Sequence, residues 1–509
     1  MSRGIAYLVG AGPGDPGLLT IRGQQCIAEA DVVIFDRLVN LRLLSHTGPN
    51  TELIYAGKSP DGHTLTQDQI NEVLVARVRE GKTVARVKGG DPFIFGRGGE
   101  EAEALAENDL DFEIVPGVTS AIAAPAYAGI PLTHRDFTTS VAIITGNEDP
   151  TKDESTIAWD KLSTGAGTLV FLMGMANLPK IVERLKRHGR PGDTPSSVIR
   201  WGTWPEQVTV VGMLDDIVEK VQAAGLKNPA VIVVGEVCKL RDRLKWIERR
   251  PLFGRRILVT RSREQASVLS NTIARLGGEA LEFPTIAIEE PLDWTPLDRA
   301  IQEIGAYNWV VFTSVNGVRY FFARLRALGR DVRGLAGVRI CAIGPVTKAA
   351  LEERGLLVEY VPVEFQAAEI ARGMQAIIEP GDRILLPRAD IAPKMLAEAL
   401  ERMGARVDDV TTYRTVPGTG DVEAVREMFE TGRMDMVTFT SSSTVRNFVS
   451  TLGADRIDGL LKGVAVACIG SVTADTAVEY GLKVDAVADE HTIDGLVAAI
   501  RGYFGGSGS

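Results

Sequence analysis

The sequence predicts an α/β protein of four lobes, in which parallel sheets are flanked by helices. Three observations predict this class. The chain has 509 residues, which is more than one hydrophobic core usually organises. Short β-branched runs alternate with helical stretches, a pattern typical of α/β sheets. The second half also carries an internal repeat, which indicates two similar lobes.

Composition and charge exclude several classes of protein. A hydrophobic fraction of 45% with 24% charged residues is that of an ordinary globular protein. The net charge of −10 argues against a general nucleic-acid binder, because neutralising phosphates needs a clustered excess of Lys and Arg. No run approaches the roughly 20 apolar residues of a membrane span, and we expect no secretory leader, because the strand-like run at residues 5–10 follows residues 1–4 directly. We therefore expect a cytoplasmic protein with no membrane or nucleic-acid partner.

The cysteines and histidines indicate no metal site. The 4 cysteines and 5 histidines are scattered along the chain, without CxxC spacing and without histidines at ligand spacing. We expect buried, reduced thiols and chemistry that does not depend on a metal.

Strand-like runs divide the chain into two halves. In the first half they lie at residues 5–10, 32–35, 84–87, 141–145, 168–173 and 231–235. A charged segment over residues 239–256 then precedes a fresh strand at residues 257–260, and we place the boundary between the halves in this segment. The predicted parts are residues 1–245, residues 246–504 and a flexible tail over residues 505–509.

A loop rich in glycine and proline follows the first strand, at residues 10–17. Together with Asp36, which closes the next strand, it invites comparison with a dinucleotide-binding loop. The details oppose that alternative. The spacing is GxGxG, and Pro13 and Pro16 remove two N–H donors that a pyrophosphate would need. A flatter, uncharged or cationic ligand, approached closely by backbone carbonyls, fits this loop better.

A second glycine-rich segment follows the strand at residues 84–87. Residues 86–101 read RVKGGDPFIFGRGGEE, so five glycines follow the end of this strand. The segment is not a Walker A loop, because Lys88 precedes the glycines and no GK[ST] follows them.

The repeat in the second half consists of two matched units. Residues 312–319 (FTSVNGVR) and 342–347 (AIGPVT) form one unit, and residues 439–446 (FTSSSTVR) and 468–473 (CIGSVT) form the other. Each unit ends a strand on Thr-Ser and begins a helix, so hydroxyls and free N–H groups gather where open sheets bind anions. N-capping by Ser or Thr would explain a single copy. Two matched copies favour a shared anionic ligand.

The motifs of the first half resemble those of a known family. YLVGAGPGDPGLLT, VVIFDRLV, AGKSPDGH, GGDPFIFGRGGEE, VPGVTSAIAAPAYAGIPLTHR and VFLMGM occur in the order seen in uroporphyrinogen-III C-methyltransferases. These enzymes have the two-lobed tetrapyrrole methylase fold, and the resemblance covers residues 1 to about 245.

The second half resembles a uroporphyrinogen-III synthase, which has a two-lobed fold of its own. The matching features are ILVTR, the FTS and IG repeats, LLPRA and VTTYRT in that order. Ala389 stands where this family more often has glycine, which affects only the local loop. Because the synthase product is the methyltransferase substrate, each resemblance supports the other.

The methyltransferase resemblance implies S-adenosylmethionine as methyl donor and a homodimer formed through this half. It implies a proton acceptor at Asp36 and a proton donor or charge-stabilising group at Lys58. Without the resemblance, Asp36 would be read as a strand-end cap and Lys58 as a solvated loop charge. The implied cofactor-binding residues are Pro13, Gly89, Gly90, Asp91, Ile94, Thr119, Ser120, Met173 and Gly202.

The synthase resemblance implies that hydroxymethylbilane is closed into a macrocycle, with inversion of its last pyrrole and without a cofactor. Tyr413 is the candidate acid, because a phenol is protonated at neutral pH and can donate. A hinge tyrosine packed between lobes is the alternative. The residues expected to bind substrate carboxylates are Arg261, Thr313, Ser314, Arg388, Thr440, Ser441, Gly470 and Thr473.

The sequence thus predicts a bifunctional enzyme that makes uroporphyrinogen III and methylates it twice to precorrin-2, towards sirohaem or cobalamin. Another corrin-pathway methylase fused to a non-catalytic tetrapyrrole-binding domain is the alternative. We also expect a two-stranded hinge between the synthase lobes. The first of these lobes should be discontinuous, because its opening strand near Ile257 should pack with residues after about Val416.

Overall fold

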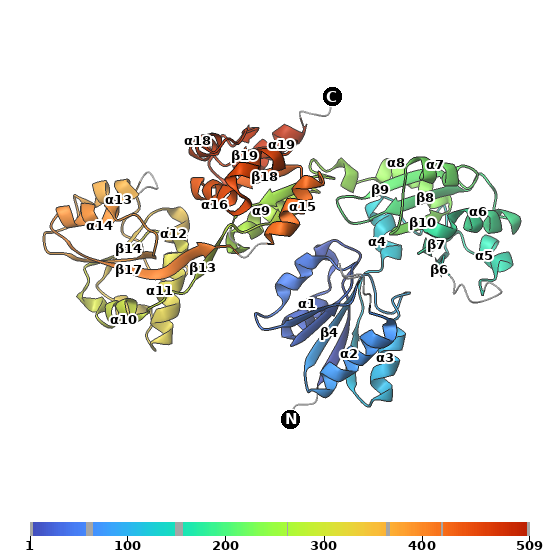
Figure 1. The fold of residues 1–509 in the computed structure, drawn as a ribbon, viewed down its shortest axis with the longest axis horizontal. Helices are drawn as coiled ribbons and strands as arrows, with labels where there is room; N and C mark the ends of the chain where they lie inside the picture. Colours follow the sequence, from blue (N-terminus) through green and yellow to red (C-terminus); the bar gives the residue numbers. More distant parts are fainter. Residues whose placement is uncertain are drawn as a thin grey trace. The chain divides into compact units, whose positions relative to one another are not determined.

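The computed structural model describes residues 4–57, 65–147, 156–261, 263–362, 367–418 and 421–505. Within these residues there are four five-stranded sheets flanked by helices (Figure 1). The chain forms two compact units. The first unit comprises Met1–Ile257, Asn271–Ala280 and Phe504–Ser509, and the second comprises Leu258–Ser270 and Leu281–Tyr503.

The first sheet is parallel throughout, with the strand order β3-β2-β4-β1-β5. Its strands are β1 (Ile5–Gly10), β2 (Val32–Phe35), β3 (Glu52–Tyr55), β4 (Thr83–Lys88) and β5 (Asp111–Val115). Its helices are α1 (Ile21–Glu29), α2 (Gln67–Arg79) and α3 (Gly98–Glu107). Successive side chains of a strand point to opposite faces. Tyr7 and Val9 therefore pack against α1, whereas Ala6 and Leu8 pack against α2 and α3 on the other face (Figure 1).

The chain leaves the neighbouring strands β1 and β4 in opposite directions. β1 continues through α1 to β2, beyond β4, and β4 continues through α3 to β5, beyond β1. The loops that follow β1 and β4 therefore diverge at their carboxyl ends, where open α/β sheets bind ligands. Backbone hydrogen bonds hold these loops together: Gly12 N donates to Gly90 O (3.1 Å), and Gly90 N donates to Gly12 O (2.7 Å).

The second sheet corrects the expectation that every sheet is parallel. Its order is β6-β7-β10-β8-β9, and only the β6–β7 pair among these strands is parallel. Residues 201–207 alone join β8 to β9, and this loop is shorter than the crossover of about a dozen residues that parallel strands need. The strands are β6 (Val141–Thr145), β7 (Thr168–Leu172), β8 (Pro195–Arg200), β9 (Val208–Met213) and β10 (Ala230–Val234).

Helices cover both faces of the second sheet. They are α4 (Ser120–Tyr127), α5 (Trp159–Gly165), α6 (Leu178–Arg187) and α7 (Ile217–Ala223). Ala121 and Ala124 of α4 pack on one face, and α5, α6 and α7 pack on the other. Because α4 follows the first sheet in the chain, it joins the two lobes of this unit.

The charged segment after β10 makes hydrogen bonds with residues far from it in the sequence, Ala128 and Leu276. It forms the short helix α8 (Arg241–Leu244), in which the buried Arg241 donates to Glu248 (2.8 Å) and to Ala128 O (2.6 Å). Further on, Leu252 is fully buried and its N–H donates to Leu276 O (2.9 Å). The compact units divide beyond this segment, after Ile257.

The third sheet combines strands from distant parts of the chain, in the order β12-β11-β18-β19-β20. Thr260 Oγ1 donates to Thr438 O (2.8 Å) across 178 residues of sequence. The strands are β11 (Arg256–Val259), β12 (Glu279–Glu282), β18 (Met436–Phe439), β19 (Ala465–Cys468) and β20 (Ala486–Val487). The helices are α9 (Arg263–Arg275), α15 (Val422–Glu430), α16 (Ser442–Leu452), α17 (Ile457–Leu460), α18 (Ser471–Glu479) and α19 (Ile493–Gly505).

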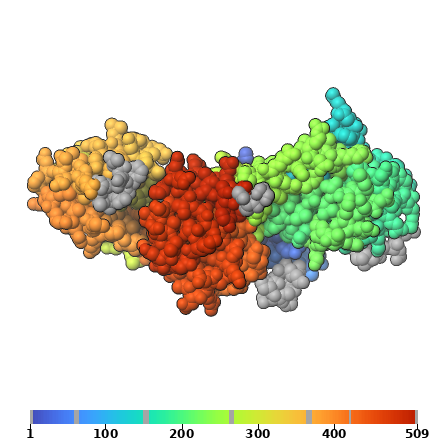
Figure 2. All heavy atoms as spheres, turned by 90° about the horizontal axis from the view of Figure 1, so that it is seen from above, coloured from blue at the N-terminus to red at the C-terminus, as the bar shows by residue number. Residues whose placement is uncertain are grey.

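The fourth sheet, β13-β17-β16-β14-β15, belongs to a lobe inserted between β12 and β18. The strands β13 and β17 pair antiparallel and form its two connections to the rest of the unit. Figure 2 shows the inserted lobe in yellow and orange and the lobe after it in red. The strands are β13 (Ile286–Glu289), β14 (Trp309–Phe312), β15 (Arg339–Ala342), β16 (Arg383–Ala389) and β17 (Arg406–Pro417). The helices are α10 (Thr295–Gln302), α11 (Val315–Ala327), α12 (Pro345–Glu352), α13 (Ala367–Met374) and α14 (Met395–Arg402).

The cysteines are buried, as the sequence predicts. Cys26, Cys238, Cys341 and Cys468 are all buried free thiols. Across the described ranges, no helix combines the length and the apolar character needed to span a membrane.

Candidate active site

A cavity of about 470 Å³ lies at the carboxyl edge of the first sheet. Residues from both lobes of the first unit line it. The first lobe contributes the two glycine-rich loops after β1 and β4, and the second lobe contributes the segments after β7 and β8 and before β10. Among the lining residues that the structure describes, Arg37 is the one charged side chain. This largely apolar lining suits a flat ligand that binds close to the backbone.

Most of the predicted cofactor positions line this cavity: Pro13, Gly89, Gly90, Ile94, Ser120, Met173 and Gly202. The other two, Asp91 and Thr119, shape its wall. The Asp91 carboxylate accepts hydrogen bonds from the backbone N–H groups of Ile94 (3.1 Å) and Gly117 (3.0 Å). Thr119 caps α4, and its hydroxyl accepts from Ala121 N (3.3 Å).

Backbone strain is concentrated around the same cavity. Phe95, Met173 and Trp201 line it with positive φ values of 53°, 57° and 49°, a region that side-chain-bearing residues rarely adopt. Each such residue costs about 1–3 kcal/mol and persists only where its surroundings fix it, which is common at ligand sites.

Direct hydrogen bonds join the two lobes beside the cavity. The Trp204 indole N–H donates to Pro13 O (3.0 Å), and Asp15 N donates to Thr203 Oγ1 (3.2 Å). The Tyr127 hydroxyl also donates to the Asp15 carboxylate (2.6 Å). The glycine- and proline-rich loop is therefore fixed by the second lobe. The aromatic segment WGTW at residues 201–204 was the available signal for these contacts, and sequence reasoning missed it.

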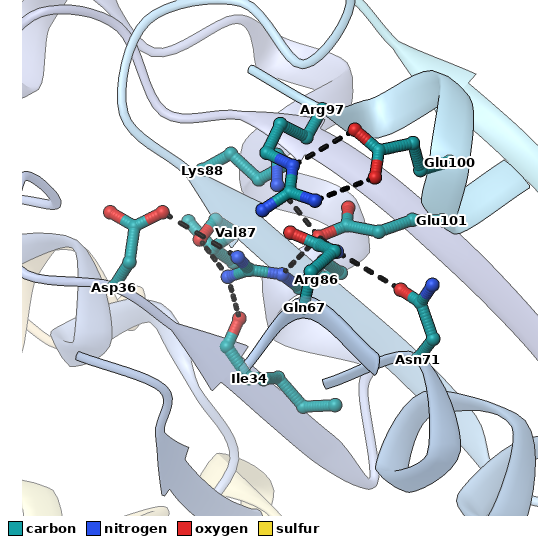
Figure 3. A network of polar contacts seen from close by, with 10 residues as sticks. All are labelled: Ile34, Asp36, Gln67, Asn71, Arg86, Val87, Lys88, Arg97, Glu100 and Glu101. Carbon is teal, nitrogen blue, oxygen red and sulfur yellow. Dashed lines mark hydrogen bonds and ion pairs between the residues drawn. The ribbon is translucent and has the colours of Figure 1, made fainter. Parts of the chain in front are cut away.

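The predicted proton acceptor lies next to a buried charge network (Figure 3). Asp36 follows β2, and its carboxylate accepts from Leu38 N (3.2 Å) and lies 3.6 Å from Arg86 Nη2. The predicted partner Lys58 lies outside the described residues.

The network itself contains Arg86, Lys88 and Glu101, whose side chains are 3%, 5% and 0% exposed. Arg86 Nε (3.0 Å) and Lys88 Nζ (2.7 Å) both donate to the same oxygen of Glu101 (Figure 3). Burial lowers the pKa of Lys88, and the nearby Arg86 charge lowers it further. Arg86 and Lys88 lie two apart on β4 and so share one face of the sheet.

The second unit brings Tyr413 and Ser314 together. The Tyr413 hydroxyl lies 3.0 Å from Ser314 Oγ, and its ring stacks on Tyr320 with centroids 5.8 Å apart. Burial raises the pKa of Tyr413, so this phenol remains protonated at neutral pH.

The matched repeats form matched helix caps. Ser314 caps α11 by accepting from Gly317 N (3.0 Å), and Ser441 caps α16 by accepting from Thr444 N (3.3 Å). Thr313 and Thr440 come directly before these caps. In the following helix of the second repeat, Thr473 is buried in the first turn of α18.

Comparison with known proteins identifies both halves. The family of tetrapyrrole (corrin/porphyrin) methylases matches residues 6–218, and the family of uroporphyrinogen-III synthase HemD matches residues 267–498. A Ruminiclostridium josui protein named porphyrin biosynthesis protein HemD is 38% identical over 507 residues, which cover 100% of this chain and 99% of the relative. The chain belongs to both families. It joins a methylase domain to a synthase domain.

Other relatives match the methylase half alone. An S-adenosyl-L-methionine-dependent uroporphyrinogen III methyltransferase of Methanosarcina barkeri is 50% identical over 239 residues, covering 47% of this chain and 94% of the relative. The crystal structure of a uroporphyrin-III-C-methyltransferase from Thermus thermophilus is 40% identical, covers 48% of this chain and 99% of that chain, and has a TM-score of 0.41.

The two arginines of the synthase half that are predicted to bind carboxylates, Arg388 and Arg261, are both at least partly buried. Arg388 is buried; its guanidinium donates to Asp409 from two nitrogens and to Pro393 O (2.8 Å). Binding a substrate carboxylate would require this ion pair to open. Arg261 follows β11 and is partly buried, and burial lowers its pKa.

Gly470 of the synthase half is constrained by a neighbouring ring. A Cβ added at this position would lie 2.5 Å from the His491 imidazole. The glycine is therefore needed for packing, whether or not it also contacts a substrate.

Proposed function

We propose that the synthase half closes hydroxymethylbilane to uroporphyrinogen III and that the methylase half transfers two methyl groups to this product, giving precorrin-2. Membership of both families supports the two activities. The cavity at the divergence of the β1 and β4 loops is the observation that supports the methylase reaction most, because most of the predicted cofactor positions line it.

The lining of the cavity fits S-adenosylmethionine. The glycines after β1 and β4 let the backbone approach a ligand closely, and the described part of the lining contains no cluster of cations that a phosphate would require. S-adenosylmethionine supplies the methyl group. Arg37 is suited to a carboxylate of the tetrapyrrole.

Methyl transfer depends mainly on positioning, because a pyrrole carbon has to approach the sulfonium methyl in line. As the new C–C bond forms, the C–S bond breaks and its electron pair stays on sulfur. The methylated ring then releases a proton, which the Asp36 carboxylate accepts. The buried pairing of Arg86 with Glu101 lies directly behind that carboxylate.

In the synthase half, Tyr413 donates its phenolic proton to the departing hydroxyl of hydroxymethylbilane, which leaves as water. Ring closure later returns a proton when the attacked pyrrole carbon regains its aromaticity. The hydroxyls and backbone N–H groups at the α11, α12, α16 and α18 N-termini bind the substrate carboxylates. This half requires no cofactor.

A coupled assay tests the proposal. Purified full-length protein is given hydroxymethylbilane with and without S-adenosylmethionine, under anaerobic conditions, and the products are resolved by mass and chromatography. We expect uroporphyrinogen III alone without the methyl donor and a doubly methylated product with it. If supplied uroporphyrinogen III is methylated but hydroxymethylbilane gives only the type I isomer, the second half is a non-catalytic tetrapyrrole-binding domain.

We also propose a homodimer formed through the methylase half. Light scattering coupled to size-exclusion chromatography would give about twice the chain mass of 54.8 kDa, and a value near one chain mass would contradict the proposal.

A further inference from the structure

We propose that Glu101 is a positioning residue for methyl transfer, which acts through Arg86 on the Asp36 carboxylate. This inference rests on the proposed function, in which Asp36 accepts the proton that the substrate releases. Glu101 lies on α3 and its side chain is fully buried, so it acts only through its neighbours.

The Arg86 guanidinium bridges the two carboxylates (Figure 3). Its Nε donates to Glu101 Oε1 (3.0 Å), and its Nη2 lies 3.6 Å from Asp36 Oδ2. Its third nitrogen, Nη1, donates to the backbone carbonyl of Val87 (3.1 Å) and lies 3.4 Å from that of Ile34. The guanidinium plane is therefore fixed by groups from α3, β4 and β2, and it reaches the end of β2, where Asp36 lies.

The burial of these charges indicates a role beyond stability. The Arg86 and Glu101 side chains are 3% and 0% exposed, and one Glu101 oxygen has no hydrogen-bond partner within the described residues. Replacing a buried ion pair by apolar side chains of similar volume is often neutral or stabilising, so packing alone does not explain the network. A fixed orientation for Asp36 does explain it.

Lys88 completes the charge balance of the network. It donates to the same Glu101 oxygen (2.7 Å) and directly precedes Gly89 at the cavity. Two cations, Arg86 and Lys88, thus lie beside two carboxylates, Asp36 and Glu101. Without the Glu101 charge, the Lys88 ammonium would lose the carboxylate to which it donates, and it would compete with Arg86 for Asp36.

The test is a double-mutant cycle on the full-length protein. Glu101→Gln, Asp36→Asn and the double variant are compared by kcat and KM for methylation of uroporphyrinogen III and by calorimetric binding of S-adenosylhomocysteine. We expect Glu101→Gln to lower kcat by about 10- to 100-fold, because a displacement near 1 Å can cost that much. The affinity for S-adenosylhomocysteine should stay within about twofold. The double variant should lose no more than Asp36→Asn does, to within about twofold.

Glu103→Gln is the matched control. Glu103 lies on the same helix, α3, is exposed and is not part of the network drawn in Figure 3. Its kcat should equal that of the parent.

The proposal is overturned if kcat of the double variant falls by the product of the two single losses. It is also overturned if Glu101→Gln weakens S-adenosylhomocysteine binding as much as it lowers kcat. An unchanged kcat in Asp36→Asn would overturn it as well. The proposed function is tested separately, by the products of the coupled assay. If Glu101→Gln does not fold, the cycle compares the double variant Lys88→Met/Glu101→Gln with Lys88→Met, because the double variant removes one cation together with the anion. The same changes in kcat and in S-adenosylhomocysteine affinity then support or overturn the proposal.

Discussion

Gly90 illustrates how a single residue sets the conformation of the loop that we propose to bind the cofactor. Its φ of 74° lies in the left-handed region, and an added Cβ would be 3.8 Å from the nearest atoms of Thr119 and Ser120. The protein has room for a Cβ, so the restriction comes from the backbone conformation, about 1–2 kcal/mol, and from the volume the ligand needs. We expect Gly90→Val to weaken S-adenosylhomocysteine binding at least about tenfold in calorimetry.

Two observations control this prediction. Gly99 lies in α3, and a Cβ added there would have no atom within 4 Å, so Gly99→Ala should leave the affinity unchanged. Synthase activity should be unchanged in both variants. Parent-like affinity in Gly90→Val would show that the loop does not contact the cofactor.

Tyr413 allows a test of acid catalysis at one residue. Because burial raises the pKa of this phenol above its ordinary value, it is protonated at neutral pH and can donate. Unassisted closure of hydroxymethylbilane gives the non-inverted isomer. Tyr413→Phe should therefore raise the type I fraction, measured by chromatography of the oxidised porphyrins.

The matched control for Tyr413 is its stacking partner. Tyr320→Phe removes a hydroxyl that donates to Ile288 O (3.2 Å) and leaves the Tyr413 hydroxyl in place. It should preserve the type III product. If Tyr413→Phe also makes only type III at the parent rate, Tyr413 is a packed hinge residue and another group is the acid.

At the scale of secondary-structure elements, the hydroxyls of the capping serines could stabilise the helices, bind substrate, or do both, and paired substitutions distinguish these roles. Ser314 and Ser441 cap α11 and α16 in the same way. Replacing a capping serine by alanine costs about 1 kcal/mol, whereas glycine costs only a few tenths. The paired change Ser314→Gly with Ser441→Gly should therefore keep the thermal unfolding temperature within a few degrees and still raise the type I fraction.

The corresponding alanine pair separates the two roles further. It should lower the unfolding temperature and raise the type I fraction. If the glycine pair retains the parent isomer ratio, the two hydroxyls serve as caps only. The hypothesis that the two repeats share an anionic ligand is then wrong.

The sequence predicts these elements well where the deciding information is local. The Gly-Pro loop after β1 and the glycine-rich segment after β4 lie at strand ends as expected, because turn residues and β-branched runs mark such ends directly. The helix starts after Thr-Ser in both repeats are predicted for the same reason, because a capping serine marks the start of a helix directly.

The sequence does not predict contacts that join distant elements. The antiparallel β8–β9 pair depends on a loop length that no motif marks, and the Trp204–Pro13 hydrogen bond spans 191 positions. The ion pair of Arg388 with Asp409 likewise joins side chains of two different strands, β16 and β17. In each instance the missing information was which strand lies next to which.

At the scale of the whole molecule, the two halves should work separately. A cut after residue 248 leaves the Arg241–Glu248 ion pair in the first fragment and the Leu252–Leu276 hydrogen bond in the second. Residues 1–248 should methylate supplied uroporphyrinogen III, and residues 249–509 should cyclise hydroxymethylbilane. If neither fragment folds, as judged by circular dichroism, the predicted boundary at residue 245 is wrong.

The pairing of Thr260 with Thr438 also has a consequence for biosynthesis on the ribosome. The strand β12 follows β11 soon after it is made, but the opposite edge of β11 waits for β18, 178 residues later. At roughly 5–20 residues per second, the wait is roughly 10–40 s. During that time an apolar strand edge is exposed to aggregation.

Nascent chains stalled at different lengths would reveal this interval. Chains stalled with about 420 residues outside the exit tunnel should be cleaved by protease near β11 and β12, and a Hsp70-type chaperone should bind them there. Chains stalled after α19 should resist cleavage. The inserted lobe, made during the wait, should already be protected at the shorter length.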